Sequence, residues 1–358
     1  MRHRIYLDHA ATTPLRPEAK AAMADAWERW ANPSSQHAEG RAARAALERA
    51  REAIRQTLGW DGELIFTGGA TEAAAIALDG SARKAIVSNV EHPAVPGAVD
   101  DARVVPVAED GLVSIEALDR ALEDRPGAMV AIQQVNSETG VIQPLEGLAG
   151  RIAARGGLLF ADCAQGAGKL PLPPADLIAI SAHKFGGPPG IGALLLRDFG
   201  MIAPRGQGQE QGYRPGTENL PAILGFAAAL SAGAQSGRMA ELAGLRADLD
   251  DAVRKAGGVV ICDAGPRLPT IASYRMPGAS AAVQLMRFDL AGIALSAGSA
   301  CASGTLKRSP VMAAIGLAPE AADEVIRVSF GWTTTAEEVA VFADAWAALA
   351  RTTEARAA

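Results

Sequence analysis

The sequence predicts an α/β protein with a large, mainly parallel sheet and a second, smaller α/β domain. Between residues 63 and 196, short apolar runs alternate with helical segments, a pattern typical of parallel βαβ units. Beyond residue 256 the strand-like runs become shorter and end on a helical segment. A chain of 358 residues also exceeds what one hydrophobic core usually supports. We therefore expect a large domain over 14–256 and a small domain over 1–13 plus 257–358.

The N-terminal segment predicts one short strand and two helices. A strand at Ile5 to Leu7 precedes a helix over 17–30, which begins on a proline and is broken by the Asn-Pro-Ser-Ser turn at 32–35. A longer helix over 39–58 ends at Gly59, because glycine readily adopts the left-handed conformation of a helix C-cap.

The alternating segment predicts seven strands. Strands are expected over 63–67, 85–88, 103–107, 129–134, 158–161, 177–181 and 191–196, with helices from Ala70, near Val95, over 115–122 and 145–155, and then over 220–233 and 239–256. The small domain is expected to contain strands over 259–262, 270–274 and 293–295 and a final helix after Thr335. Thr335 and Glu338 have the spacing of a capping box, which supports a helix start there.

Composition limits the class of protein. The chain is 49% hydrophobic and 21% charged, as in a globular protein, and its net charge of −6 argues against a nucleic-acid partner. No apolar run approaches the ~20 residues that span a bilayer, and the N-terminus has no signal-peptide pattern. Cys163, Cys262 and Cys301 are too few and too scattered for a disulfide framework or a CxxC metal site. We expect a cytoplasmic protein with no metal, membrane or nucleic-acid ligand.

Lys184 is the first candidate for chemistry. It follows an apolar strand in DLIAISAHKFGGPPG and is one of only six lysines among 34 basic residues. An ε-amine can form an imine with a carbonyl cofactor, whereas a guanidinium stays protonated and is no nucleophile. The alternative is a surface lysine at the end of a strand.

Two further strand ends would complete a cofactor site. The glycine turn in IFTGGATEA leads into a helix whose free N–H groups would cradle a phosphate, although an ordinary βα turn has the same sequence. Asp162 directly follows an apolar strand in FADCAQGAGK, where it would either cap a helix or pair with a protonated pyridine nitrogen. An Asp combined with an imine-forming Lys is the protein side of pyridoxal-phosphate chemistry.

Four other side chains have both a structural and a functional interpretation. His92 in VEHPAV would stack on a planar cofactor or relay a proton, and Asn136 in VNSETG would bind a ligand or form a turn. Cys301, flanked by small residues in AGSACASG, would be either a reactive or an inert thiol. Arg327 would grip a carboxylate or form a surface ion pair.

These motifs together resemble the pyridoxal-phosphate-dependent cysteine desulfurases of the NifS/IscS type, in the class V aminotransferase family with the fold-type-I architecture. The resemblance covers nearly the whole chain in one order. It rests on YLDHAATTP, NPSSQHAEGR, FTGGATEA, VEHPAV, VNSETGVIQP, DCAQGAGK, SAHKFGGPPGIGAL, GQGQEQGYRPGTEN, AGSACASG and RVSFG.

The resemblance implies pyridoxal 5′-phosphate as cofactor and a role for each matching residue. Lys184 would hold the cofactor as an imine and move the substrate's α-proton, and Asp162 would keep the pyridine nitrogen protonated. Gln165 would hydrogen-bond the phenolic oxygen, and His92 would stack on the ring. Ala70, Thr71, Ser181 and His183 would bind the phosphate. Thr217 matches a threonine that reaches the phosphate of the neighbouring subunit, which implies a homodimer.

The implied reaction removes sulfur from L-cysteine. Arg327, with Asn136 and Asn32, would bind the substrate carboxylate. Cys301 would take the sulfur as a persulfide, leaving L-alanine, and pass it to an acceptor protein in iron–sulfur cluster or thio-cofactor assembly. Alternatives are transamination, a selenocysteine lyase reaction, or an inactive cofactor-binding assembly partner. GPPG replaces the family's GPKG after the lysine, and GQG replaces its glycine triplet. The segment after the last helix is shorter than the tail with which housekeeping members engage a scaffold, which leaves the acceptor open.

Overall fold

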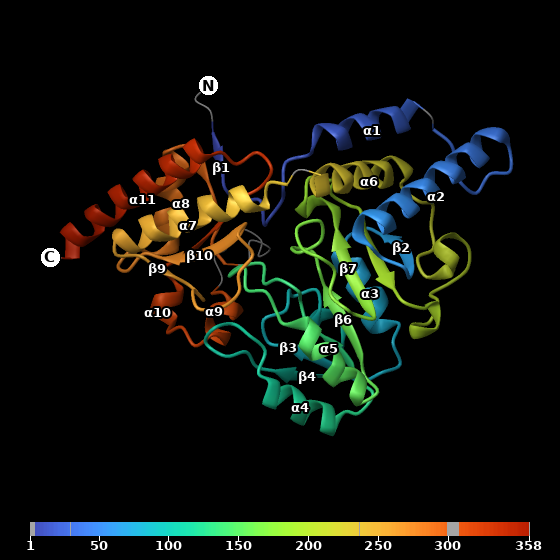
Figure 1. Ribbon diagram of the computed structural model, residues 1–358, viewed down its shortest axis with the longest axis horizontal. Helices are drawn as coiled ribbons and strands as arrows, with labels where there is room; N and C mark the ends of the chain where they lie inside the picture. The colour runs from blue at the N-terminus through green and yellow to red at the C-terminus, as the bar shows by residue number, and fades with distance from the viewer. Residues whose placement is uncertain (1–3, 29, 236, 299–307, 358) are drawn as a thin grey trace.

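The computed structural model describes residues 4–28, 30–235, 237–298 and 308–357, arranged around two principal sheets (Figure 1). The larger sheet has seven strands in the order β2-β8-β7-β6-β5-β3-β4. These are β2 (Glu63–Thr67), β3 (Ala85–Ser88), β4 (Ala102–Val105), β5 (Met129–Ala131), β6 (Leu158–Asp162), β7 (Leu177–Ser181) and β8 (Gly192–Leu196).

The expectation of a mainly parallel sheet is confirmed, with one reversed strand. Adjacent strands from β4 to β7 pair in parallel, but β8 pairs antiparallel with both β7 and β2. A parallel return needs a crossover of a dozen or more residues, usually with a helix. Residues 182–191 instead form a short loop that begins with the 3₁₀ turn η2 (Ala182–Lys184), so the chain turns back directly.

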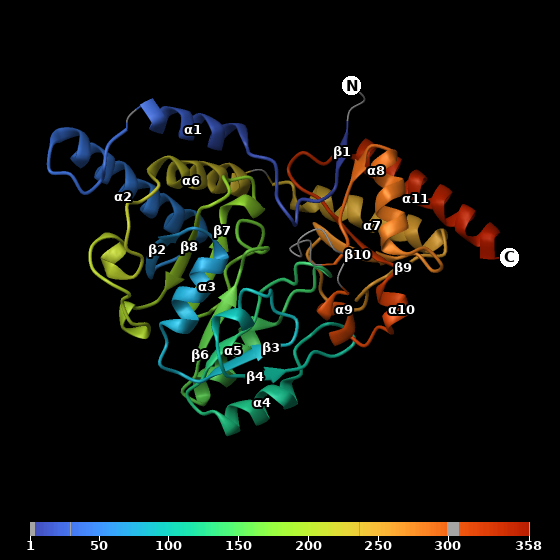
Figure 2. The same ribbon diagram turned by 180° about the vertical axis from the view of Figure 1, so that it is seen from behind.

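Helices cover both faces of this sheet (Figures 1 and 2). They are α1 (Pro17–Glu28), α2 (Ala38–Leu58), α3 (Ala70–Asp79), α4 (Ile115–Asp124), α5 (Leu145–Ala154) and α6 (Leu220–Gln235). The pleat of β2 shows how the core is divided: Leu64 and Phe66 pack with α2, whereas Ile65 packs with α3. A helix expected near Val95 is only the 3₁₀ turn η1 (Pro96–Ala98), because the prolines at 93 and 96 lack the N–H that a helix needs.

The smaller sheet is antiparallel, in the order β12-β10-β9. Its strands are β9 (Val259–Val260), β10 (Ile271–Arg275) and β12 (Val325–Ser329), and beside it β1 (Ile5–Tyr6) pairs with β11 (Ile293–Ala294). The accompanying helices are α7 (Met239–Lys255), α8 (Ala281–Leu290), α9 (Pro310–Ala314), α10 (Pro319–Ala322) and α11 (Ala336–Ala357), and the remaining 3₁₀ turns are η3 (Phe199–Met201) and η4 (Gln209–Gly212). The predicted capping box is confirmed: Thr335 and Glu338 exchange side-chain-to-backbone hydrogen bonds at the start of α11.

Helix α7 belongs to the core of the smaller sheet. Its residues Leu242, Leu249 and Val253 are buried in one cluster with Tyr274 and Trp346. We therefore propose that the small domain begins at α7, earlier than the predicted boundary at residue 256. Among the described helices, none is by itself long and apolar enough to cross a membrane; α6 and α7 meet those criteria only as a pair bent by 72°.

Candidate active site

A cavity of about 480 Å³ lies where loops from several strands of the large sheet meet. Ligands collect at the carboxyl ends of parallel strands, where the loops after β2, β3, β5, β6 and β7 come together. Nine of the predicted site residues line this cavity: Ala70, Thr71, His92, Asp162, Gln165, Ser181, His183, Lys184 and Arg327. Residues from the N-terminal segment and from the smaller sheet complete its walls.

Lys184 ends the η2 turn after β7 and reaches toward the N-terminal segment. Its Nζ donates to the carbonyl oxygens of Ala10 at 2.7 Å and Ala11 at 3.0 Å. Thr13 ties the two segments together, since its Oγ1 donates to the Lys184 carbonyl at 3.1 Å and its N–H donates to that of His183 at 2.8 Å. The amine is thus positioned at the wall by backbone carbonyls.

Asp162 provides a half-buried carboxylate at the same cavity. It ends β6, and its Oδ1 accepts a 2.9 Å hydrogen bond from the Ala164 N–H. Burial raises the pKa of Asp162, against the opposing effects of that hydrogen bond and of the charges on His92 and Lys184. Among the described residues Asp162 has no salt bridge, so a protonated ring nitrogen would provide the positive partner that its carboxylate needs.

Gln165 has an unsatisfied polar end. It is 3% exposed, and its Nε2 donates to the Ala10 carbonyl at 2.9 Å. Its buried Oε1 has no hydrogen-bond partner within the described ranges. Buried amide groups are usually paired, so this end of the side chain is suited to a polar ligand in the cavity.

The loop between β2 and α3 is suited to bind an anion. Gly69 precedes α3 with a φ of 144°, which favours glycine, and no side chain caps the helix. The N–H groups of Ala70 and Thr71 therefore lie at the positive end of the helix without a capping side chain, beside Ser181 and His183. Burial and the charge of Lys184 lower the pKa of His183 to about 4, so its imidazole is neutral at neutral pH. These groups fit the phosphate of the implied cofactor.

His92 is also neutral at the cavity wall. Burial lowers its pKa, and its Nδ1 accepts a 3.2 Å hydrogen bond from the Ala94 N–H. The neutral ring therefore carries its proton on Nε2.

Arg327 projects from β12 into the opposite wall and is 3% exposed. Its Nη1 donates to the Ser137 carbonyl at 3.0 Å, and its Nη2 donates to Asp8 Oδ1 at 2.9 Å and to Ser296 Oγ at 2.8 Å. Its buried Nε has no partner in the described part of the chain. Three hydrogen bonds hold the guanidinium, which leaves two of its five N–H donors, that on Nε among them, for a carboxylate.

Four predicted site residues are not among those lining the cavity. Asn136 is buried and its amide closes its own loop, with Oδ1 accepting from the N–H groups of Glu138 and Thr139. Asn32 is exposed and accepts from the Ser34 N–H, and Thr217 is exposed on another loop. Cys301 lies outside the described residues.

Several groups at the cavity had no role predicted from the sequence. The Ala10 and Ala11 carbonyls and Asp8 come from YLDHAATTP, a motif used only for its resemblance. Glu91 is buried beside His92; it accepts from Ser88 Oγ at 2.5 Å and from the Gln133 N–H at 2.9 Å, and burial raises its pKa to about 8. A backbone acceptor has no side-chain signal, so only the three-dimensional arrangement reveals it.

The chain is similar to a known protein family, to curated proteins and to solved structures. The chain matches the Aminotransferase class-V family over residues 5–342. A cysteine desulfurase of Cereibacter sphaeroides is 40% identical over 363 aligned positions, covering 93% of this chain and 92% of that protein. The X-ray structure of a NifS-like protein from Rickettsia africae ESF-5 has a TM-score of 0.90 and 29% identity, covering 96% and 98% of the two chains. A structure of SspA in complex with cysteine has a TM-score of 0.79 and 27% identity, covering 91% and 98%.

Proposed function

The chain belongs to the class-V aminotransferase family, and from this premise we propose that it is a pyridoxal-phosphate-dependent L-cysteine desulfurase. The family is the one that its motifs resemble, and the predicted fold and cofactor class agree with it. The observation that carries the proposal is that Lys184, Asp162 and Arg327 line one cavity. An imine-forming amine, a partner for a ring nitrogen and a carboxylate-binding group are what an α-amino acid substrate of such an enzyme requires.

Different residues of the cavity are assigned to different parts of the cofactor. When bound, pyridoxal phosphate supplies a carbonyl for imine formation and an electron sink for charge at the substrate α-carbon. Asp162 would hold a proton at the ring nitrogen, and the unsatisfied end of Gln165 would bind a polar ring substituent. Ala70, Thr71, Ser181 and His183 would bind the phosphate, and the neutral ring of His92 would contact the cofactor ring.

Lys184 and Arg327 act on the substrate. Lys184 would hold the cofactor through its carbonyl group, and its amine would move the α-proton of cysteine. The Ala10 and Ala11 carbonyls position its Nζ for both tasks. Arg327 binds the substrate carboxylate through its remaining donors. Asn136 and Asn32 stay predicted contributors. Asn136 bonds within its own loop and to the Val90 carbonyl, and Asn32 bonds to the Ser34 N–H.

We assign sulfur removal to Cys301. Its thiolate attacks the substrate sulfur, so that a sulfur–sulfur bond forms, the carbon–sulfur bond of cysteine breaks, and the bonding electron pair stays with the carbon that becomes the alanine side chain. The overall change converts cysteine and the Cys301 thiol to alanine and a Cys301 persulfide, with no external oxidant.

The proposal extends to partners. Thr217 is exposed on the loop before α6, as a residue that binds the phosphate of a second subunit would be, and we propose a homodimer on this basis. A cytoplasmic location and an acceptor protein in iron–sulfur cluster or thio-cofactor assembly complete the proposal.

The test is product analysis of the purified holoenzyme. With L-cysteine and a thiol reductant, we expect alanine and sulfide in equal amounts, and intact-protein mass spectrometry without reductant should show one added sulfur atom. Cys301→Ala should lose both, whereas Cys262→Ala, which changes a half-buried thiol elsewhere, should keep them. Amino-group transfer to a keto acid without sulfur release would instead indicate a transaminase.

A further inference from the structure

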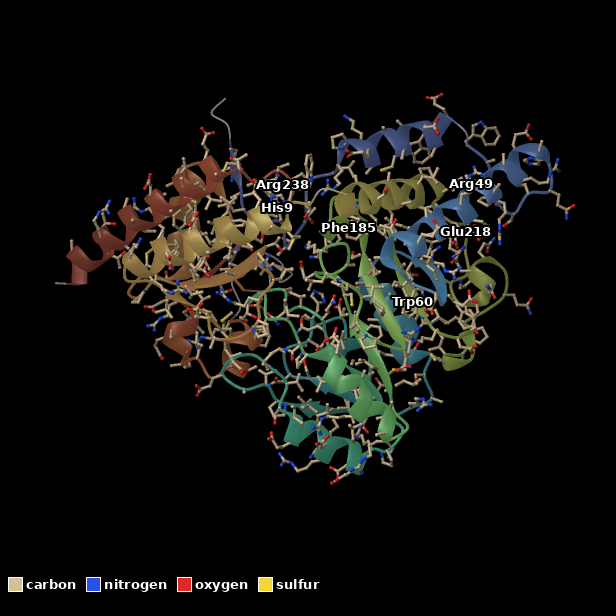
Figure 3. The ribbon with its side chains drawn as sticks, in the orientation of Figure 1. His9, Arg49, Trp60, Phe185, Glu218 and Arg238 are labelled. Carbon is tan, nitrogen blue, oxygen red and sulfur yellow. The ribbon has the colours of Figure 1, made fainter. Side chains whose placement is uncertain are left out.

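A second, smaller cavity of about 60 Å³ shares Lys184 with the active-site cavity. Its walls come from both halves of the chain. The part near the large sheet contributes Thr13, Arg16, Lys169, Lys184 and Phe185; the other part contributes Arg238, Met239, Leu242, Thr270, Phe330 and Trp332. Figure 3 shows Phe185 on one side of this junction and His9 and Arg238 on the other.

The charge of this lining has one sign only. Arg16, Lys169, Lys184 and Arg238 line the cavity, and no Asp or Glu of the described part of the chain does. Arg238 is paired with Glu241 at 3.0 Å, and Lys184 is bonded to backbone carbonyls. The side chain of Lys169, in contrast, makes no hydrogen bond or salt bridge with any residue that the structure describes. Arg16 also has no carboxylate partner among the described residues, but it donates to the Phe185 carbonyl at 3.1 Å, so Lys169 is the cation of this lining to which those residues offer neither kind of partner.

The surroundings make that missing counter-charge costly. Burial and the charge of Lys184 lower the pKa of Lys169 to about 7. His9, the nearby titratable ring, is itself kept neutral: burial and the charge of Lys169 lower its pKa to about 3. Lys169 is half-buried, and an ammonium that has lost part of its hydration is destabilised unless an opposite charge offsets the loss.

Two uncharged groups of the lining also favour an anion. Thr270 is 2% exposed, and its hydroxyl Oγ1 has no partner in the described ranges although the residue lines the cavity. Met239 is the first residue of the 17-residue helix α7, so the positive end of that helix lies at the same wall. A lysine, a threonine with an unpartnered hydroxyl and a helix N-terminus thus line one small space.

We propose that this cavity binds one small inorganic anion of the halide class, held by Lys169 and Thr270 between the two halves of the chain. The volume suits this ligand, since a water molecule occupies about 30 Å³ in the liquid and chloride is of similar size. The bound anion supplies the charge that Lys169 lacks and connects the large sheet to α7. Binding therefore stabilises the folded holoenzyme and favours the protonated amine.

Diffraction from holoenzyme crystals grown in sodium bromide gives the direct test. We expect an anomalous bromide peak in the cavity, in contact with Lys169 Nζ and Thr270 Oγ1, and its loss in Lys169→Met. The control Lys84→Met, which alters an exposed lysine, should keep the peak. Only water in the cavity, or bromide at surface sites alone, would overturn the proposal.

Thermal unfolding of the holoenzyme tests the site in solution. At constant ionic strength, replacing sodium gluconate by sodium bromide should raise the midpoint saturably for the parent and for Lys84→Met, and should leave Lys169→Met unchanged. Thr270→Val removes the hydroxyl with little change of shape, so it decides the matter if Lys169→Met does not fold; its response should weaken several-fold. Equal responses of Thr270→Val and the parent would contradict the site. Neither measurement depends on turnover, so the result stands apart from the proposed desulfurase activity.

Discussion

The two cavities that meet at Lys184 differ in how their charges are balanced. In the larger one, Asp162 faces the positive groups and Arg327 is already paired with Asp8. In the smaller one, the described residues place four cations in the walls and no carboxylate. The larger cavity is thus built for ligands that carry both signs, such as an amino acid and a pyridine phosphate, whereas the smaller one suits a single negative ion. Lys184 thus lines both the proposed active site and the proposed anion-binding site.

Replacing each cavity's lysine should separate these roles most strongly. Lys184→Ala removes the imine-forming amine, so we expect alanine formation to fall by about 10³-fold or more, with loss of the visible absorbance of lysine-bound cofactor. Lys169→Met, the matched change in the smaller cavity, should keep activity within about tenfold, because its amine lines only the smaller cavity. Equal losses in the two variants would show that the cavities are not functionally distinct.

The negative group of the larger cavity gives the next largest effect. Asp162→Asn leaves the hydrogen bond to the Ala164 N–H possible but removes the charge that keeps the ring nitrogen protonated. We expect turnover at saturating cofactor to fall about 10²- to 10³-fold. Asp162→Glu should recover part of this, and a fully active Asp162→Asn would remove the assigned role.

The larger cavity was predictable where chemistry lies in side chains at strand ends. Lys184, Asp162 and the glycine turn before α3 each follow an apolar run, and a mainly parallel sheet brings such positions to one edge. The same rule could not anticipate the reversal of β8, because a strand's direction depends on the connection before it and not on its own apolar pattern. The proposed shift of the domain boundary to the start of α7 has a related reason: the amphipathic pattern of α7 does not say which sheet covers it.

The remaining parts of both cavities depend on long-range contacts. Asp8 meets Arg327 across 319 positions of sequence, and Lys169 reaches the same cavity as Thr270 from a different half of the chain. Asn136 had two interpretations; its Oδ1 does accept within its own turn and its Nδ2 donates to the Val90 carbonyl, while its role in ligand binding stays a prediction. Sequence spacing does not show which buried polar groups lack a hydrogen-bond or ion-pair partner in the folded chain. Those groups are what distinguishes the two cavities.

The salt bridge between Asp8 and Arg327 offers a third test of the charge balance in the larger cavity. Asp8→Asn keeps the shape but removes the charge that fixes the guanidinium, so we expect the KM for L-cysteine to rise about tenfold with a smaller change in kcat. The control Asp289→Asn removes a carboxylate from an exposed pair with Arg4 and should leave both constants unchanged. A decrease in kcat alone would indicate a different role for Asp8.

Glu91, beside the larger cavity, should make the folded protein less stable as pH rises. Its pKa is near 8 in the folded chain and 4.5 ordinarily, so between these values the native state keeps a proton that the unfolded state has lost. Stability from this group is present below pH 4.5 and is lost as pH rises through 8. Glu91→Gln removes the dependence, so its stability relative to the parent should grow by about 1 kcal/mol per pH unit over that window in denaturant unfolding. A pH-independent difference would contradict the buried proton.

Lys169 should show the opposite and smaller trend in the smaller cavity. Its pKa is near 7 in the folded chain against 10.5 ordinarily, so above pH 7 the unfolded state binds more protons and parent stability rises with pH up to about 10.5. Relative to Lys169→Met, the parent should therefore gain stability from pH 7 to 9 in gluconate, by less than the Glu91 effect because the lysine side chain is partly exposed. Bromide should flatten this dependence, since an anion beside the ammonium raises its pKa toward the ordinary value. If this stability difference changes with pH equally in both salts, the lysine titrates without a bound anion. The two cavities would then differ only in how their charged groups are hydrated.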